Sequence, residues 1–320
     1  MTKSKIKISN LYIFFLLFLI ILLVISPKNA MQSFFLGLNI WATKVLPALL
    51  PFFILTKLLS YTQFVNSFGK ILSPVTKKLY GVGGNAGYVF VMSIISGYPV
   101  GAKLLSDLYT DQKITQKQAI AITSFTSTSG PLFILGTVSI GLFDSRSMGI
   151  IVLISHLLGS LINGLFYRIK QDNAEYSIHT QSTSNFLNDS MTSSITSIMT
   201  VGGFIAIFYM GLQLMIACHI FDPIVYAFDL IGLDSNLTLS IISGLIEVTT
   251  GAIMLSPLSL NPTILTAILT FLISFGGLSI HAQAYCFLKN FHMPYKLFLL
   301  QKTTQAITST ILAVIICIFI

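Results

Sequence analysis

The segment SIISGYPVGA at residues 93–102 returns later in the chain as SIISGLIEVTTGA at residues 240–252. Both copies begin with the same five residues, and both end with a Gly-Ala pair. Glycine permits tight backbone turns, and proline removes a backbone donor and interrupts a helix. Each copy therefore predicts a break inside an otherwise apolar segment, and the recurrence predicts two related halves.

The composition of the chain is that of an integral membrane protein. Of its 320 residues, 54% are hydrophobic and only 9% are charged, and the mean hydropathy is +0.86. Soluble domains carry roughly 25% charged residues, so lipid must be the solvent for much of this surface. The net charge of +8 is scattered between apolar segments and forms no continuous patch, which argues against nucleic-acid binding.

The pattern of apolar and polar stretches divides the chain into four regions. Residues 1–30 predict an N-terminal membrane anchor with a span from Ile8 to Ile25. A cleaved signal peptide is the alternative, and Lys28 argues against it because a lysine spoils a small-residue cleavage site. The other three regions are a first half at 31–168, a cytoplasmic linker at 169–190 and a second half at 191–320.

The basic residues predict a cytoplasmic N-terminus, because cytoplasmic loops of membrane proteins carry an excess of lysine and arginine. We let both broken segments be re-entrant hairpins that do not cross the membrane. The cytoplasmic side then holds Lys3, Lys5, Lys7, Lys70, Lys77, Lys78, Lys103, Lys113, Lys117, Arg168, Lys170, Lys289, Lys296 and Lys302. Only Lys28 and Arg146 lie in outside loops. This arrangement predicts an all-α, multi-pass protein of a bacterial inner membrane, with seven to eight crossings plus two hairpins.

A second correspondence supports an inverted repeat. The polar interruption from Ser124 to Gly130 follows the first hairpin, and a similar one from Ser274 to Ser279 follows the second. In the orientation above, the first hairpin enters from inside and the second from outside. Inverted repeats with Gly/Pro-broken segments in matching positions are typical of secondary transporters that bind substrate near the midplane.

Glu247 is the carboxylate that lies inside an apolar segment, at the break of the second hairpin. Ionisable residues at membrane depth are costly and are functional candidates by default. With Thr249 or Thr250, Glu247 is a candidate ligand for a coupling Na⁺, or it carries a proton. The alternative is a carboxylate that pairs with a lysine and only closes the hairpin.

The first hairpin has an anion-binding pattern at the matching place. Gly97, Tyr98, Pro99 and Gly101 form its break, and backbone N–H groups at a half-helix N-terminus attract anions. Lys103 follows and either adds charge to the site or extends to the cytosol.

Two hydroxyl-rich and amide-bearing stretches complete the candidate substrate site. In the first half these residues are Ser127, Ser129, Gly130 and Pro131, and in the second half they are Ser279, His281 and Gln283. The hydroxyls either contact substrate oxygens or satisfy backbone groups freed by the break. His281 relays protons or makes an interhelical hydrogen bond.

The sequence gives little support to enzyme chemistry. It contains no P-loop, no GxGxxG and no nucleophile–histidine–acid motif. His156, His179, His219 and His292 show no metal-ligand spacing and are interpreted as structural or exposed. We therefore expect no metal site and no cofactor other than a coupling Na⁺ or H⁺.

These motifs resemble those of the nucleoside-recognition (Gate) domain family, and in particular the sporulation integral membrane proteins of the YlbJ type. The likeness covers approximately Met31 to Ile320 and rests on GYPVGAK at 97–103, SGP at 129–131, EVTTG at 247–251 and SIHAQ at 279–283. It implies a relative of concentrative nucleoside transporters, with two re-entrant hairpins and an inverted repeat. By resemblance alone, Tyr98, Pro99, Gly101, Ser129, Glu247, Thr249 and His281 map onto the hairpin and site motifs.

For the YlbJ type the resemblance implies export of dipicolinic acid from the mother cell across the outer forespore membrane. This first half has no intramembrane acid, whereas nucleoside carriers usually place carboxylates or amides in both halves. We therefore expect a small anionic metabolite, with lipid as surroundings and a homo-oligomer as an open possibility. Two alternatives stay open: a carrier of nucleosides or other small molecules, and a membrane sensor or assembly factor without transport.

Overall fold

The computed structural model describes residues 17–170 and 185–319, and within these ranges it contains helices and no strands. The expected start of the first span, residues 8–16, and most of the expected linker lie outside the described residues. The elements up to residue 166 are α2 (Pro27–Ile40), the π-helix η1 (Trp41–Val45), α3 (Leu46–Ser60), α4 (Phe64–Tyr80), α5 (Asn85–Ser96), α6 (Val100–Thr110), α7 (Gln116–Thr126), the π-helix η2 (Leu132–Ile140), α8 (Gly141–Phe143) and α9 (Arg146–Phe166). The later ones are α10 (Phe186–Ala217), α11 (Asp222–Asp229), α12 (Ser235–Ile246), α13 (Val248–Leu255), α14 (Pro262–Phe275), α15 (Gly277–Leu288), the 3₁₀-helix η3 (Lys289–Phe291) and α16 (Tyr295–Phe319).

Local sequence signals set the ends of several helices. Thr115 and Gln118 form a capping box at the start of α7, which satisfies two backbone donors of its first turn. Asp234 caps α12 by accepting from the N–H of Leu237. Gly81 ends α4 and Gly276 ends α14, both in the left-handed conformation that glycine adopts at low cost.

Four helices of the described chain are long and apolar enough to cross a membrane, or up to six if each bent pair counts as one span. The four are Arg146–Phe166, Phe186–Ala217, Pro262–Phe291 and Tyr295–Phe319. This is fewer than the seven to eight crossings that the sequence predicted. The difference arises because apolar stretches are broken into short helices: the stretch from Ser33 to Leu59, for example, contains α2, η1 and α3.

The surface of the long helices supports a lipid environment. On α9 the exposed apolar residues Ile150, Ile154 and Leu158 recur every fourth position, and on α16 Ile307, Ile311 and Ile315 do the same. Residues four apart lie on one face of a helix, so each helix presents an apolar stripe to the outside. The protein is therefore a multi-pass membrane protein in which polar residues face inward.

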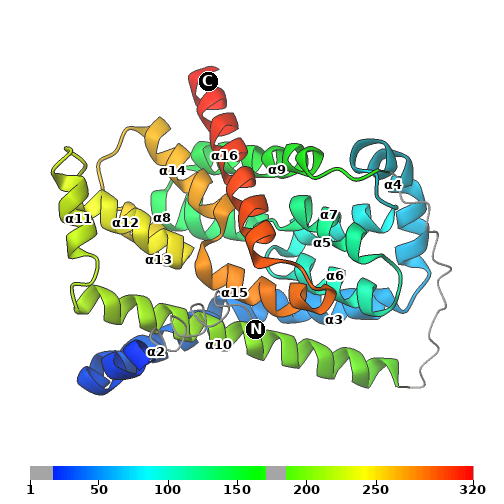
Figure 1. The fold of residues 1–320 in the computed structure, drawn as a ribbon, viewed down its shortest axis with the longest axis horizontal. Helices are drawn as coiled ribbons and strands as arrows, with labels where there is room; N and C mark the ends of the chain where they lie inside the picture. Colours follow the sequence, from blue (N-terminus) through cyan, green and yellow to red (C-terminus); the bar gives the residue numbers. More distant parts are fainter. Residues whose placement is uncertain (1–16, 171–184, 320) are drawn as a thin grey trace, which may run out of the picture.

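Helices α9 and α16 pack against each other. Gly159 lies so close to Ser309 that a Cβ at Gly159 would come within 2.1 Å of the Ser309 hydroxyl. In Figure 1 α16 lies between the α12–α13 pair on the left and the α5–α6 pair on the right, while α9 follows the upper edge and α10 the lower edge.

Each half contains the same order of breaks. A helix pair interrupted at Gly97–Pro99 (α5 and α6) is followed by α7, a break at 127–130 and η2. In the second half, α12 and α13 are interrupted at Glu247, and α14 and α15 at Gly276. The two hairpin breaks expected from the repeated segment are thus present, and so are the two later interruptions.

Candidate functional site

A cavity of about 220 Å³ lies where the breaks of both halves meet. Its wall combines residues from three of the interruptions and from α15, which follows the fourth, with apolar side chains from η1, α3, η2 and α10. The lining residues are Ile40, Val45, Leu49, Phe52, Ile95, Ser96, Gly97, Tyr98, Ser129, Gly130, Leu132, Phe133, Thr137, Ile205, Tyr209, Glu247, Val248, Thr249, Ser279, Ile280 and Gln283. Segments far apart in sequence therefore contribute polar groups to one small chamber.

The first hairpin break is shaped by close backbone contact. Gly97 has φ +76° and ψ −166°, a conformation essentially restricted to glycine. A Cβ at Gly97 would lie 2.5 Å from the backbone nitrogen of Gly130, so the hairpin break and the interruption after α7 touch each other. In the second half, a Cβ at Gly277 would lie 3.0 Å from the carbonyl oxygen of Gly244, which joins α15 to the second hairpin.

Glu247 closes the second hairpin by capping α13. Its carboxylate accepts hydrogen bonds from the N–H of Thr249 (3.1 Å), the N–H of Thr250 (2.7 Å) and the hydroxyl of Thr250 (2.7 Å). Negative charge is stabilised at a helix N-terminus, where N–H groups lack partners. The side chain is 8% exposed, lines the cavity and forms no ion pair within the described part of the chain.

Tyr98 is held against the cavity by a buried lysine. The hydroxyl of Tyr98 donates to the carbonyl oxygen of Ser127 at 2.6 Å and accepts from the ammonium group of Lys302. Lys302 also donates to the Ser127 carbonyl (2.9 Å) and to Oε1 of Gln305 (2.7 Å). The first hairpin, the break after α7 and α16 are thereby joined at one point.

His156 on α9 connects the two halves at the same level. The N–H of Ser129 donates to Nε2 of His156 at 2.8 Å, and Nδ1 lies 2.8 Å from the hydroxyl of Ser274. Because Nε2 accepts, a neutral ring carries its proton on Nδ1 and donates it to Ser274. The sequence interpreted His156 as structural or exposed; it is fully buried and bridges both broken helices.

Of the three predicted site residues in α15, two line the cavity and the third bonds to the end of α14. Ser279 and Gln283 line the cavity and contact each other at 3.2 Å. His281 does not line it; its Nε2 donates to the carbonyl oxygen of Phe275, which satisfies the C-terminal end of α14 at the break. An intramolecular hydrogen bond, one of the two interpretations of His281, is therefore present.

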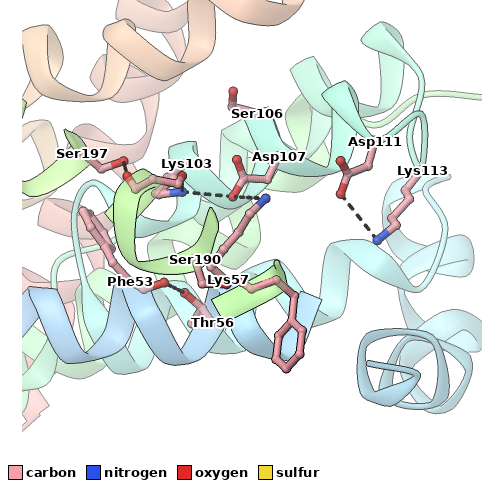
Figure 2. A network of polar contacts seen from close by, with 12 residues as sticks. Phe53, Thr56, Lys57, Lys103, Ser106, Asp107, Asp111, Lys113, Ser190 and Ser197 are labelled. Atoms are coloured by element: carbon pink, nitrogen blue, oxygen red, sulfur yellow. Dashed lines mark hydrogen bonds and ion pairs between the residues drawn. The ribbon is translucent and has the colours of Figure 1, made fainter. Parts of the chain in front are cut away.

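Lys103 lies away from the cavity wall, in a separate ion cluster. Figure 2 shows Asp107 between Lys103 and Lys57, with nitrogen–oxygen distances of 3.1 and 3.6 Å. Lys103 also donates to the hydroxyl of Ser193 on α10. The cluster joins α3, α6 and α10, so Lys103 here neither contacts the chamber nor extends into the cytosol: it is 4% exposed.

The structure brings together eight of the predicted site residues on the cavity wall and leaves seven outside it. The wall residues are Gly97, Tyr98, Ser129, Gly130, Glu247, Thr249, Ser279 and Gln283. Three of the others lie at the breaks: Pro99 precedes α6, Pro131 precedes η2, and Gly101 packs against Ser93 and the Thr126 carbonyl. The remaining four are Ser127, Thr250, His281 and Lys103.

The prediction of Lys302 as a residue of a cytoplasmic loop is wrong. The last span was expected to begin at Thr303, whereas α16 begins at Tyr295 and buries Lys302 to 1% exposure. Its ammonium group is stabilised by three acceptors inside the protein. The signal available in the sequence was the polar set Gln301, Lys302 and Gln305, which lies on one helical face within an otherwise apolar run.

Within the described ranges, no group of three or more His, Cys, Asp or Glu side chains is arranged to hold a metal ion. The donors at the cavity are hydroxyls, amides, backbone groups and the Glu247 carboxylate. Such a set suits hydrogen bonding to a polar metabolite and oxygen ligation of an alkali cation better than transition-metal chemistry.

Comparison with known proteins gives two matches. The model of the Gate family, described as nucleoside recognition, matches residues 42–146, which include the first hairpin. The chain is similar to the sporulation integral membrane protein YlbJ of Bacillus subtilis (strain 168), with 30% identity over 344 residues that cover 99% of this chain and 84% of that protein. No solved structure matches.

Proposed function

The chain belongs to the YlbJ family of sporulation integral membrane proteins, and on that basis we propose that it is a secondary transporter of a small anionic metabolite. Dipicolinic acid, moved during sporulation, is the substrate we favour. The observation that carries the proposal is the cavity lined by three helix breaks and by α15, which begins at the fourth. Substrate sites of secondary transporters lie between repeats at such discontinuous helices.

We place the two halves in an inverted repeat like that of concentrative nucleoside transporters. Gly101 and Gly251 fix an offset of 150 residues, and this offset pairs Gly159 with Ser309. These two residues are in contact where α9 meets α16. A two-fold axis brings residues near it beside their own counterparts, so the contact supports a pseudo-two-fold relation between the halves.

The chemistry of the chamber supports a small aromatic anion. Phe52 and Phe133 offer apolar surface for a ring, while the breaks supply hydroxyls, amides and backbone groups for carboxylates. At about 30 Å³ per water, the cavity equals the space of about seven waters, which suits a metabolite of about a dozen non-hydrogen atoms. We propose that the wall residues Gly97, Tyr98, Ser129, Gly130, Ser279 and Gln283 contact this substrate.

We assign ion coupling to Glu247 with Thr249 and Thr250. The carboxylate is at the chamber and has no lysine or arginine partner among the described ion pairs, so binding of Na⁺ or H⁺ changes the charge of the site directly. The proposed location is a bacterial inner membrane with a cytoplasmic N-terminus, and during sporulation the outer forespore membrane.

A nucleoside carrier is the second candidate. The specific observation in its favour is the match of residues 42–146 to the family described as nucleoside recognition. Amide and hydroxyl groups of Gln283 and Ser279 are also suited to hydrogen bonding with a neutral sugar or base.

The test is uptake of radiolabelled dipicolinate and uridine into proteoliposomes, with and without Na⁺ and proton gradients. We expect saturable dipicolinate uptake driven by one gradient and lost in Glu247→Gln. Uptake of uridine alone would support the nucleoside carrier. Absence of flux from folded protein that still binds ligand would favour a sensor and contradict the transport proposal.

A further inference from the structure

Lys302 is a buried lysine whose partners are all uncharged, and the three acceptors around its nitrogen match the three N–H donors of an ammonium group. Its ammonium group bonds to the hydroxyl of Tyr98, the carbonyl of Ser127 and the amide oxygen of Gln305. Lys302 forms no ion pair with any residue that the structure describes. Burying an ammonium group is expensive, and an opposite charge normally compensates for it. Lys103, which is nearly as buried, has such a partner in Asp107.

Tyr98 lies between this charge and the cavity. The Lys302 nitrogen is 4.8 Å from the centroid of the Tyr98 ring, and Tyr98 itself forms part of the cavity wall. Lys302 does not reach the wall. Its positive charge is therefore separated from a bound ligand by the side chain of a single residue.

We propose that Lys302 is a specificity-determining residue that selects anionic ligands, acting through Tyr98 on the carboxylate of a small organic acid in the cavity. This inference rests on the proposed function and adds to it the origin of charge selectivity. The uncharged polar groups on the wall can bond to an acid and to a neutral analogue, and the Glu247 carboxylate disfavours the acid, so the Lys302 charge is what favours the acid in our proposal.

The size of the effect depends on the separation between the Lys302 ammonium group and a carboxylate in the cavity, which we take as about 8 Å. Two unit charges about 8 Å apart at an effective dielectric constant of about 20 attract each other by about 2 kcal/mol, or about 30-fold in affinity. Removing the charge must therefore weaken binding of a carboxylate by about this factor and leave an uncharged ligand of the same shape nearly unaffected.

The test is calorimetric binding of dipicolinate and of its uncharged isostere, pyridine-2,6-dicarboxamide, to the full-length protein in detergent. Lys302→Met is expected to weaken dipicolinate binding by about 30-fold and to change isostere binding by less than about threefold. Lys302→Arg keeps the charge and is expected to retain the preference for the acid. Lys296→Met removes a charge from an exposed position of the same helix and serves as the matched control.

A second variant tests whether the Lys302 charge acts on the bound acid or only compensates the charge of Glu247, which lines the same cavity. In the Glu247→Gln background, our inference predicts that Lys302→Met still weakens dipicolinate binding by about 30-fold. If Lys302 only neutralises Glu247, Lys302→Met has no effect on dipicolinate binding in that background. Should Lys302→Met fail to fold, Tyr98→Phe removes the phenol acceptor and is expected to reduce the preference for the acid over its isostere.

Outcomes distinguish this inference from the transport proposal. Unchanged dipicolinate binding in Lys302→Met, with flux intact in the wild type, would overturn the inference alone. Selective binding that depends on Lys302, without any flux, would support the inference and contradict transport. Wild-type protein that binds uridine and neither dipicolinate nor another carboxylate would overturn both.

Discussion

At the scale of single residues, Glu247 caps α13, and the ion coupling that we propose for it is a separable role. Two backbone N–H groups and the Thr250 hydroxyl hold the carboxylate. These contacts need an oxygen acceptor, whereas ion coupling needs a charge. Substitutions that keep one property and remove the other therefore separate structure from coupling.

We predict that Glu247→Gln retains the part of the cap that one amide oxygen can accept, such as the two bonds from Thr250, and loses gradient-driven flux. Glu247→Ala removes the cap as well and is expected to destabilise the protein by about 1–2 kcal/mol. Thermal unfolding in detergent measures the first property, and proteoliposome flux with and without gradients measures the second. Gradient-driven flux at the wild-type rate in Glu247→Gln would contradict the coupling role.

His156 gives a prediction about stability. His156→Leu leaves the buried N–H of Ser129 and the hydroxyl of Ser274 without their partner, at a cost of about 2–3 kcal/mol. We expect a lower unfolding midpoint and a smaller loss in His156→Gln, which keeps both an acceptor and a donor. An unchanged midpoint in His156→Leu would show that the bridge contributes nothing to the joined breaks.

The sequence was informative about residues whose type is unusual for their surroundings. Glu247 could be predicted because a carboxylate in an apolar segment is conspicuous. Lys302 could not be placed, because the start of the last span was set eight residues late and its lysine was counted among loop charges. His156 was overlooked because its partners, Ser129 and Ser274, are distant in sequence and only the tertiary fold joins them.

At the scale of elements, the two hairpin breaks were predictable from the repeated segment, because glycine and proline interrupt a helix. The contact between each hairpin break and the interruption that follows it could not be predicted from the sequence. It depends on backbones that approach at Gly97 and Gly130, and at Gly277 and Gly244. The π-helices η1 and η2 also have no sequence signal as plain as a Gly-Pro break.

This contact predicts that Gly97→Ala is destabilising. The new Cβ would meet the Gly130 nitrogen at 2.5 Å, and the backbone angles of Gly97 disfavour any side chain by about 1–3 kcal/mol. Gly203→Ala is the control, because nothing lies within 4 Å of its Cβ in α10 and alanine favours a helix by about 1 kcal/mol. We expect Gly97→Ala to lower the unfolding midpoint and the flux, and Gly203→Ala to maintain both.

At the scale of the whole molecule, the proposed inverted repeat predicts which side of the membrane each loop faces. Lys117 follows the first hairpin and Ser259 follows the second, and both residues are exposed. In the inverted arrangement these positions face opposite sides of the membrane, with Lys117 in the cytoplasm. Two halves of parallel orientation would place them on the same side.

Single cysteines at these positions, in a protein without Cys218, Cys286 and Cys317, test the arrangement. We expect a membrane-impermeant maleimide to label Ser259→Cys in intact cells and Lys117→Cys only after the cells are opened. Labelling of both in intact cells would contradict the inverted repeat, because no single orientation of inverted halves exposes both loops.

The most direct test of the substrate site is protection of the cavity by ligand. Thr137 lies on the wall and is partly exposed, so Thr137→Cys in the cysteine-free protein is expected to react with a small thiol reagent. Ser259→Cys, in a loop, is the control for unspecific effects of the ligand. The account predicts that dipicolinate slows modification of Thr137→Cys in a saturable manner and leaves Ser259→Cys unaffected. Equal rates at Thr137→Cys with and without dipicolinate, under conditions in which the protein transports it, would contradict the assignment of this cavity as the substrate site.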